Sequence, residues 1–343
     1  MIGFSNMFKA ELYKLAKLKT LLKVLIAIVI IFVVATILYA AVVNLIGGLE
    51  MASVNPESEI TKENVEAAEQ ASKEHEAIYE SEKANVQLCD NDRYVLKSIA
   101  TLYRYMYDNG MTFDSYSVFG TMASFSANSY IVFIMNIMST VMIVFAAVSI
   151  IRSIAGERAA GTLKMQLLRP VSKDAMLAAK FLAVYVVSLG IYVLTFILSC
   201  VVWICAFNVD AKQILAVIDA SKVIVMSPAA MLIIYLVYYA TVIFAYTSLG
   251  MFLACVIKKN EALPIVIALI IVFLGGSIEG TLGYAFIGYA GFATNISWIN
   301  ALTINGPTLN HMALYTMIPI AFVWVFGMLA LGWNSFRKAE IHS

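Results

Sequence analysis

Charged residues in this chain stand in a few blocks that are separated by long stretches with no charge. The six uncharged stretches cover residues 24–49, 115–151, 181–209, 223–257, 262–278 and 280–336. A bilayer core about 30 Å thick is crossed by about 20 apolar helical residues, so each stretch can hold most or all of one span. The charge pattern therefore predicts an all-α polytopic membrane protein with six transmembrane helices.

The composition agrees with a membrane protein and argues against several other classes. Hydrophobic residues make up 62% of the chain and charged residues 13%, whereas soluble domains average about 45–50% and about 25%. The formal net charge of +1 argues against a basic nucleic-acid-binding protein. The four cysteines and three histidines show no metal-ligand spacing. We expect no catalytic residue and no metal site.

Lysine and arginine gather in alternate segments between the spans, as they do on the cytoplasmic side of membranes. This pattern predicts a protein of the inner (cytoplasmic) membrane with both termini in the cytoplasm. The predicted order is an amphipathic N-terminal helix (1–20), spans at 21–46, 130–151, 181–207, 229–257, 262–280 and 313–336, an extracytoplasmic helical domain (47–129), a cytoplasmic coupling loop (152–180), an outer loop (208–228), a cytoplasmic loop (258–261), a re-entrant hairpin with an outer loop (281–312) and a cytoplasmic tail (337–343).

The segment between the first two spans differs in kind from the other connections. It holds fourteen of the 22 acidic residues and six basic ones, and part of it has helical periodicity. We expect a small helical domain outside the membrane. It is either a platform for a substrate or partner, or a solvated helical hairpin that only caps the protein.

Four glycines, Gly275, Gly276, Gly280 and Gly283, interrupt the apolar sequence around the end of the fifth predicted span. A continuous helix over 262–294 would be longer than the bilayer is thick. Breaks in its outer third would let the chain fold back, which is tolerated where protein or a water-filled cavity surrounds the backbone. We predict a short re-entrant hairpin on the outer side; an ordinary glycine-rich loop is the alternative.

Chemistry within the membrane has few candidates. The sequence contains no phosphate-binding loop of the Walker type, so the chain has no such means of holding ATP. Ionisable residues inside a membrane are functional candidates, but Glu261 and Glu279 fall near span ends, which argues against an ion-coupled carrier. Polar residues of the second span are predicted to line a pathway, or else to bond between helices: Asn136, Ser139, Thr140 and Ser149.

The cytoplasmic loop carries a family resemblance. Glu157-Arg158, Gly161-Thr162-Leu163, Arg169-Pro170-Val171-Ser172 and Lys180 resemble the cytoplasmic signature of type-2 ABC exporter permeases. Residues 8–20 are similar to the helix that lies along the membrane surface before the first span in that family. Within it, the chain looks most like the bacterial permeases that export bacitracin-like peptides, lantibiotics or sodium, although its outer segment is longer than in the compact exporters.

The resemblance implies a non-catalytic membrane subunit driven by a separate ATPase. Two ATPase copies would bind ATP and Mg²⁺, while this chain holds no cofactor and pairs with a second permease, either identical or a sister chain. The residues implied in coupling to the ATPase are those of the loop, Glu157, Arg158, Gly161, Thr162, Leu163 and Arg169, with Glu11 of the N-terminal helix.

Glu11 lies within the apolar arc of the N-terminal helix. It is either a charge buried against the coupling segment or an error of the periodicity, and a simple interfacial anchor would need neither. The function that we predict is export of an amphipathic peptide, antibiotic or lipid-like molecule. The alternatives are sodium export, an ion-coupled carrier, and a membrane scaffold or sensor.

Overall fold

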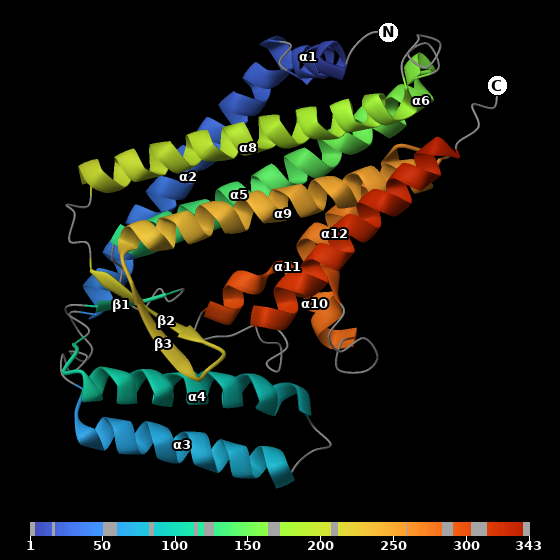
Figure 1. Cartoon of the computed structure of the whole chain (residues 1–343). Coiled ribbons are helices and arrows are strands. Elements are labelled where there is room, and N and C mark those ends of the chain that lie inside the picture. Colours follow the sequence, from blue (N-terminus) through green and yellow to red (C-terminus); the bar gives the residue numbers. More distant parts are fainter. Residues whose placement is uncertain are drawn as a thin grey trace.

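The helices run roughly alongside one another between two distinct ends of the molecule (Figure 1). In the computed structural model the described residues are 4–15, 18–50, 60–81, 86–112, 116–119, 127–163, 172–206, 212–258, 260–282, 291–302 and 314–338. One end of the molecule carries both chain termini, and the other carries the helices α3 and α4 with the β-strands. The first end is the one that the charge pattern assigns to the cytoplasm.

Long apolar helices form the body of the protein. They are α2 (Leu18–Glu50), α5 (Ala127–Ile151), α8 (Lys173–Ala206), α9 (Pro228–Val256), α10 (Ala262–Leu282) and α12 (Leu314–Arg337). Among the described residues, five stretches are long and apolar enough to cross a membrane: Tyr130–Ala159, Lys173–Val202, Pro228–Val256, Ala262–Glu279 and Leu314–Arg337. A shorter apolar stretch of α2, Leu25–Ala41, adds to them. The predicted class, a helical polytopic membrane protein, is confirmed.

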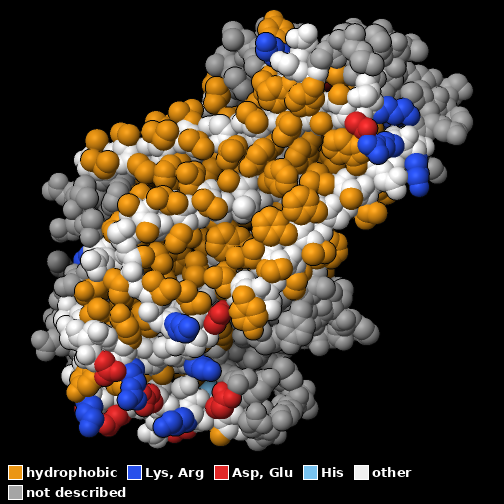
Figure 2. Space-filling view, viewed as in Figure 1, with side chains coloured by type: hydrophobic (Ala, Val, Ile, Leu, Met, Phe, Trp, Pro, Cys, Tyr) orange, Lys and Arg blue, Asp and Glu red, His pale blue; other side chains and the backbone are white. Residues whose placement is uncertain are grey.

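The surface is divided in the way that a bilayer requires. In Figure 2, hydrophobic side chains cover the middle of the viewed face, and charged side chains gather toward its two ends. Many large apolar side chains on α2, α8, α10 and α12 are exposed. A soluble protein rarely exposes apolar area on this scale, so lipid or another membrane helix covers these faces.

The centre of the bundle is the contact between α5 and α9, and a glycine makes it close. A Cβ atom built on Gly250 would lie 2.6 Å from Cγ2 of Ile150 and 2.9 Å from the carbonyl oxygen of Ala147. On the other side of α9, a Cβ on Gly332 of α12 would lie 3.1 Å from Cα of Phe252. Small residues let membrane helices approach closely and gain dispersion contacts. These glycines therefore fix the spacing of α5, α9 and α12.

The outer end holds a helical hairpin and a small sheet. The hairpin is formed by α3 (Lys62–Ser81) and α4 (Val86–Asp108), and Arg104 bonds Glu69 across it at 2.6 Å. The strands β1 (Tyr116–Val118), β2 (Gln213–Ile218) and β3 (Lys222–Met226) form the sheet in that order, with β1 parallel and β3 antiparallel to β2. Leu102 and Met106 of α4 pack on Leu215 and Val217 of β2.

This sheet corrects the prediction of a plain outer loop over 208–228 and of a purely helical outer domain. Most of strand β3 lies in the uncharged stretch that continues into α9, and apolar length alone does not separate the strand from the helix. The turn between β2 and β3 places Asp219 and Ala220 at φ of 49° and 51°. Paired left-handed residues are typical of the tight hairpin turns that match strand twist.

The hairpin turn is held from two sides. On the side of the outer domain, the hydroxyl of Thr101 in α4 donates to the carbonyl of Ala220 at 3.0 Å. On the side of the bundle, the amide of Leu314, the first residue of α12, donates to the carboxylate of Asp219 at 3.2 Å. The amide of Asp219 donates to the carbonyl of Ala301 at 3.5 Å. The turn thus joins the outer domain to the start of α12.

The prediction that glycines break the fifth span is wrong for three of them. Gly275, Gly276 and Gly280 lie within α10, which continues to Leu282. A glycine costs a helix only about 1 kcal/mol relative to alanine, which the surrounding apolar helix absorbs. Gly283 lies outside the described residues. The chain continues in the described part as two short helices, α11 (Phe292–Ile296) and η3 (Trp298–Leu302), whose residues are mostly buried.

Replacing Gly250 with alanine should destabilise the bundle, because the added methyl group meets the α5 backbone and forces the two helices apart. Overpacking of this kind costs about 1–3 kcal/mol. Gly190 of α8 is the matched control, since a Cβ there meets nothing within 4 Å. Thermal unfolding of the purified protein in detergent measures both variants. Equal melting temperatures for Gly250→Ala and Gly190→Ala would contradict the close packing of α5 and α9.

Candidate functional site

The C-terminal end of α5 turns into the segment that the sequence marked for coupling. After Ile151 the chain forms a π-helical turn, η1 (Arg152–Gly156), and then the short helix α6 (Glu157–Ala159). Gly161 follows with φ of 72°, a left-handed conformation that favours glycine. The hydroxyl of Thr162 donates back to the carbonyl of Glu157 at 3.1 Å. The predicted coupling loop (152–180) begins with this compact turn; residues 164–171, with Arg169, lie outside the described residues.

The turn presents one side to the surface and one to the bundle. Residues 159–162 are exposed, while Leu163 is buried. Arg158 points inward, because its Nη1 donates to the carbonyl of Ala254 at 3.1 Å in the last turn of α9. A cation at a helix C-terminus is favourable, since unpaired carbonyls and the helix dipole meet it there. Arg158 therefore fixes the turn to α9.

Four charged side chains from three segments meet beside this turn. The ammonium of Lys180 in α8 lies 3.1 Å from Oε1 of Glu11 in α1 (Phe4–Leu15) and 2.6 Å from Oε2 of Glu157. The ammonium of Lys14 lies 2.9 Å from Oε1 of Glu11 and 3.0 Å from Oε1 of Glu157. We call these four residues the charge cluster. Two positive and two negative groups alternate in it.

Lys180 is the buried centre of the charge cluster. Its side chain is fully buried, and its ammonium also lies 3.4 Å from the hydroxyl of Ser153. A lysine ammonium has three N–H donors, and the three acceptors here match that number. A buried charge is tolerated when it is paired and fully hydrogen-bonded. Lys180 thus holds α1 and the coupling turn to α8.

Lys14 closes the charge cluster on its solvent side. Burial disfavours its ammonium, but hydrogen bonds and the negative charges of Glu11 and Glu157 outweigh that effect and raise the pKa of Lys14 above its ordinary value. A lysine with a raised pKa contributes its stabilisation at every pH below the ordinary value and loses it only as the pH rises through the raised one. The contribution of Lys14 is therefore constant around neutral pH.

A second ionic contact ties the start of α8 to the end of α12. Asp174 accepts two hydrogen bonds from Arg337, at 2.6 and 2.7 Å, and a third from the indole of Trp333 at 2.6 Å. The hydroxyl of Ser172 caps α8 by accepting from the amide of Ala175 at 3.2 Å. The start of α8 is therefore fixed at α12 as well as at α1.

A glutamate of α10 caps the short helix α11. The carboxylate of Glu279 accepts hydrogen bonds from the amides of Ala293 and Thr294, at 3.0 and 2.8 Å, and from the Thr294 hydroxyl at 3.0 Å. Gly291 permits this approach, because a Cβ there would collide with the same carboxylate. A Cβ atom on Gly275 would lie 3.1 Å from the Cβ atom of Ala293. The carboxylate and two glycines thus hold α11 against α10.

Comparison with known families decides the identity. The family described as "ABC-2 family transporter protein" matches residues 6–341, nearly the whole chain. The chain belongs to this family. No protein in the curated comparison matches it. ABC-2 proteins are membrane components of ABC transporters, and such a permease typically works with an ATPase partner.

The ABC-2 permease brings together some of the residues that the sequence singled out. Glu157 and Glu11 share the charge cluster, and Gly161, Thr162 and Leu163 follow directly in the same turn. Lys14 was not among the predicted site residues, although it stands three residues after Glu11 on the same helix. The capping role of Glu279 was also missed, because no short motif links it to an amide fourteen residues later.

The four polar residues of α5 do not form one group in the permease. The side-chain amide of Asn136 donates to the carbonyl of Val132 at 2.8 Å and accepts from the hydroxyl of Tyr239 in α9. Ser139 and Thr140 both donate to the carbonyl of Asn136. Asn136 and Thr140 are exposed, Ser139 is buried and Ser149 is half-buried. Of the four, Asn136 and Thr140 have the exposure that a residue lining a pathway needs.

Replacing Lys180 with methionine should release α1, because the two glutamates then face each other without their buried cation. Removing one partner of a buried ion pair costs about 3–5 kcal/mol. Lys9→Met is the matched control, since Lys9 is exposed on α1. Limited proteolysis of the N-terminal segment in membranes measures the release. Equal cleavage rates in both variants would show that the charge cluster does not hold α1.

Proposed function

We propose that the chain is the permease subunit of an ATP-driven exporter in the cytoplasmic membrane. It crosses the membrane six times with both termini inside, because α2 adds a first span to the five long apolar stretches. It pairs with a second permease to form the pathway. Two separate ATPase subunits bind ATP and Mg²⁺, and this chain binds neither. The observation that carries the proposal is the charge cluster, together with the family.

Force from an ATPase needs a rigid route into the spans, and the charge cluster offers one. The exposed residues 159–162 offer a surface that an ATPase can touch in the described part of the loop. Glu157 precedes them directly, and Lys180 joins it to α8 and α1. Movement of the turn is then shared by α5, α8 and α1. Glu157 acts in this proposal by positioning the turn, and Arg158 by holding it to α9.

The proposed substrate is an amphipathic peptide, antibiotic or lipid-like molecule. Transport of sodium requires oxygen ligands, preferably carboxylates, within the spans. In the outer part of the described spans, the carboxylate of Glu279 already accepts three hydrogen bonds from α11. The exposed polar side chains of α5, Asn136 and Thr140, are uncharged, and their donors bond to carbonyls of α5 itself. This supports an uncharged or amphipathic path over a sodium site.

Reversing Glu157 to lysine should uncouple the exporter. Three lysines would then surround Glu11, and mutual repulsion would expel the turn from its place on α8. We expect loss of the ATPase during affinity purification in mild detergent, and loss of transport. Glu66→Lys is the matched control, since Glu66 is an exposed glutamate on α3 at the opposite end.

The same purification tests the assembly itself. An ATPase subunit that copurifies with the original chain and with Glu66→Lys, but not with Glu157→Lys, supports the proposal. Absence of any ATPase from the original chain would overturn it. Retention of the ATPase by Glu157→Lys, with full transport, would remove the charge cluster from coupling.

A further inference from the structure

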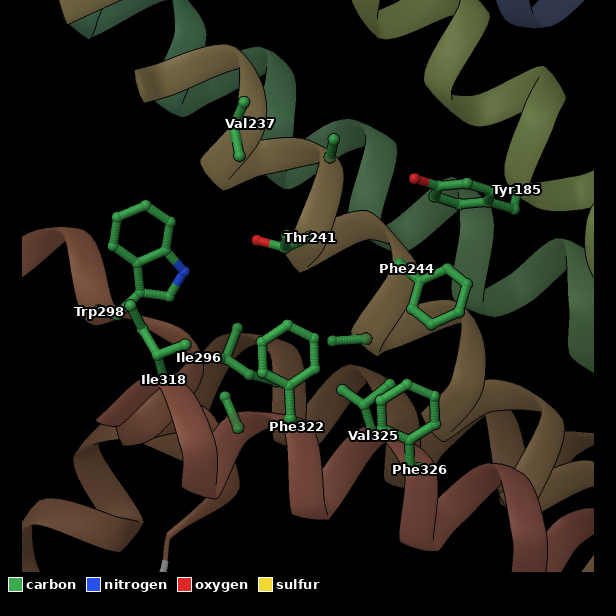
Figure 3. Close-up of a pocket in the computed structure, with 13 residues that line it drawn as sticks. Tyr185, Val237, Thr241, Phe244, Ile296, Trp298, Ile318, Phe322, Val325 and Phe326 are labelled. Atoms are coloured by element: carbon green, nitrogen blue, oxygen red, sulfur yellow. The ribbon is translucent and has the colours of Figure 1, made fainter. Parts of the chain in front are cut away.

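A cavity of about 260 Å³ opens between α9, α12 and the short helices of the outer side. Figure 3 shows Val237, Thr241 and Phe244 of α9 on one wall, and Phe322 and Phe326 of α12 facing them. The cavity is completed by Tyr185 of α8 and by Ile296 and Trp298, which close it toward the α11 and η3 segment. Its size is near the lower limit of ligand pockets, about 300 Å³.

The walls of the cavity offer almost no polar group to a ligand. The hydroxyl of Thr241 already donates a hydrogen bond within α9, to the carbonyl of Tyr238 at 2.6 Å. The ring of Tyr185 packs edge-on against Phe244, with ring centres 5.1 Å apart, and that of Trp298 packs edge-on against Tyr238 at 5.2 Å. A charged or hydrogen-bonding group would lose its hydration here without compensation. The lining therefore favours a hydrocarbon occupant.

The mouth of the cavity is continuous with the surface that faces the bilayer. Val237, Phe322 and Phe326 stand at it with exposed fractions of 51%, 52% and 60%, and the exposed Ile233 and Val323 extend the same apolar faces. Three of the lining helices are membrane-spanning stretches. Within the hydrocarbon layer, acyl chains are the molecules present at the highest concentration.

We propose that this cavity binds one acyl chain of a bilayer phospholipid. The chain enters between Val237 and Phe322 and reaches the buried side chains of Ala245 and Val325, which bilayer lipid outside the cavity does not touch. Its contacts with Ile296 and Trp298 support the α11 and η3 segment. This role is independent of the substrate and of the ATPase.

Photolabelling tests the proposal on the full chain reconstituted in phosphatidylcholine vesicles. A small fraction of the lipid carries a diazirine on an acyl chain, and the labelled residues are mapped by mass spectrometry. We expect label at Ala245 and Val325. Ala321→Phe and Ala240→Leu fill the cavity from α12 and from α9, and each should abolish this label. Ala330→Phe, on an exposed position of α12, should retain it.

Two results would overturn the proposal. One is label confined to exposed positions and unchanged in Ala321→Phe, which would mean that no chain enters. The other is loss of the buried label when a single-chain cationic amphiphile is added at low concentration, which would assign the cavity to a substrate-like molecule instead. Because labelling needs neither ATP nor an ATPase, its outcome is separate from that of the copurification experiment.

Discussion

A peptide group in the hydrocarbon layer has no water to bind, so each segment that crosses must satisfy its own N–H and C=O groups. This constraint makes the body of the protein helical. It also explains where the backbone can depart from a regular helix. The π-helical turn η1 and the sheet lie at the two ends of the bundle, and α11, which is short and mostly buried, has its first amides bound by the carboxylate of Glu279.

Charge obeys a related rule at the end of the bundle that carries both chain termini. Lys180 is buried, yet its three hydrogen bonds replace those it would make with water. Such an arrangement is specific in geometry, because a shift of α1 or of the coupling turn would leave an ammonium or a carboxylate without its partner. Asp174 and Arg337 fix the same helix at a second point, but they are more exposed and contribute less. The buried cluster therefore sets the position of the turn.

Apolar length and charge spacing were enough to predict the helical membrane class, because both follow directly from the thickness and dielectric of the bilayer. The position of Glu11 on the packed face of its helix could also be read from periodicity. Its partner could not, since Lys180 is 169 residues away and only the folded chain brings them together. The sheet was missed because its strands are short and lie in segments far apart in the sequence, residues 116–118 and 213–226, which only the folded chain brings together. The glycines of α10 were misread as breaks, although Gly275 serves close packing against α11.

The turn at Asp219 and Ala220 has a mechanical consequence. Its backbone and side chain bond to α4, to η3 and to the first residue of α12, and β3 leads directly into α9. A hinge needs a joint that can rotate without breaking hydrogen bonds. Rotation about this turn would break its hydrogen bonds to α4, η3 or α12. The hairpin α3–α4 is therefore connected, through this one turn, to the starts of both α9 and α12, and we expect a displacement of α4 to act on the two helices together.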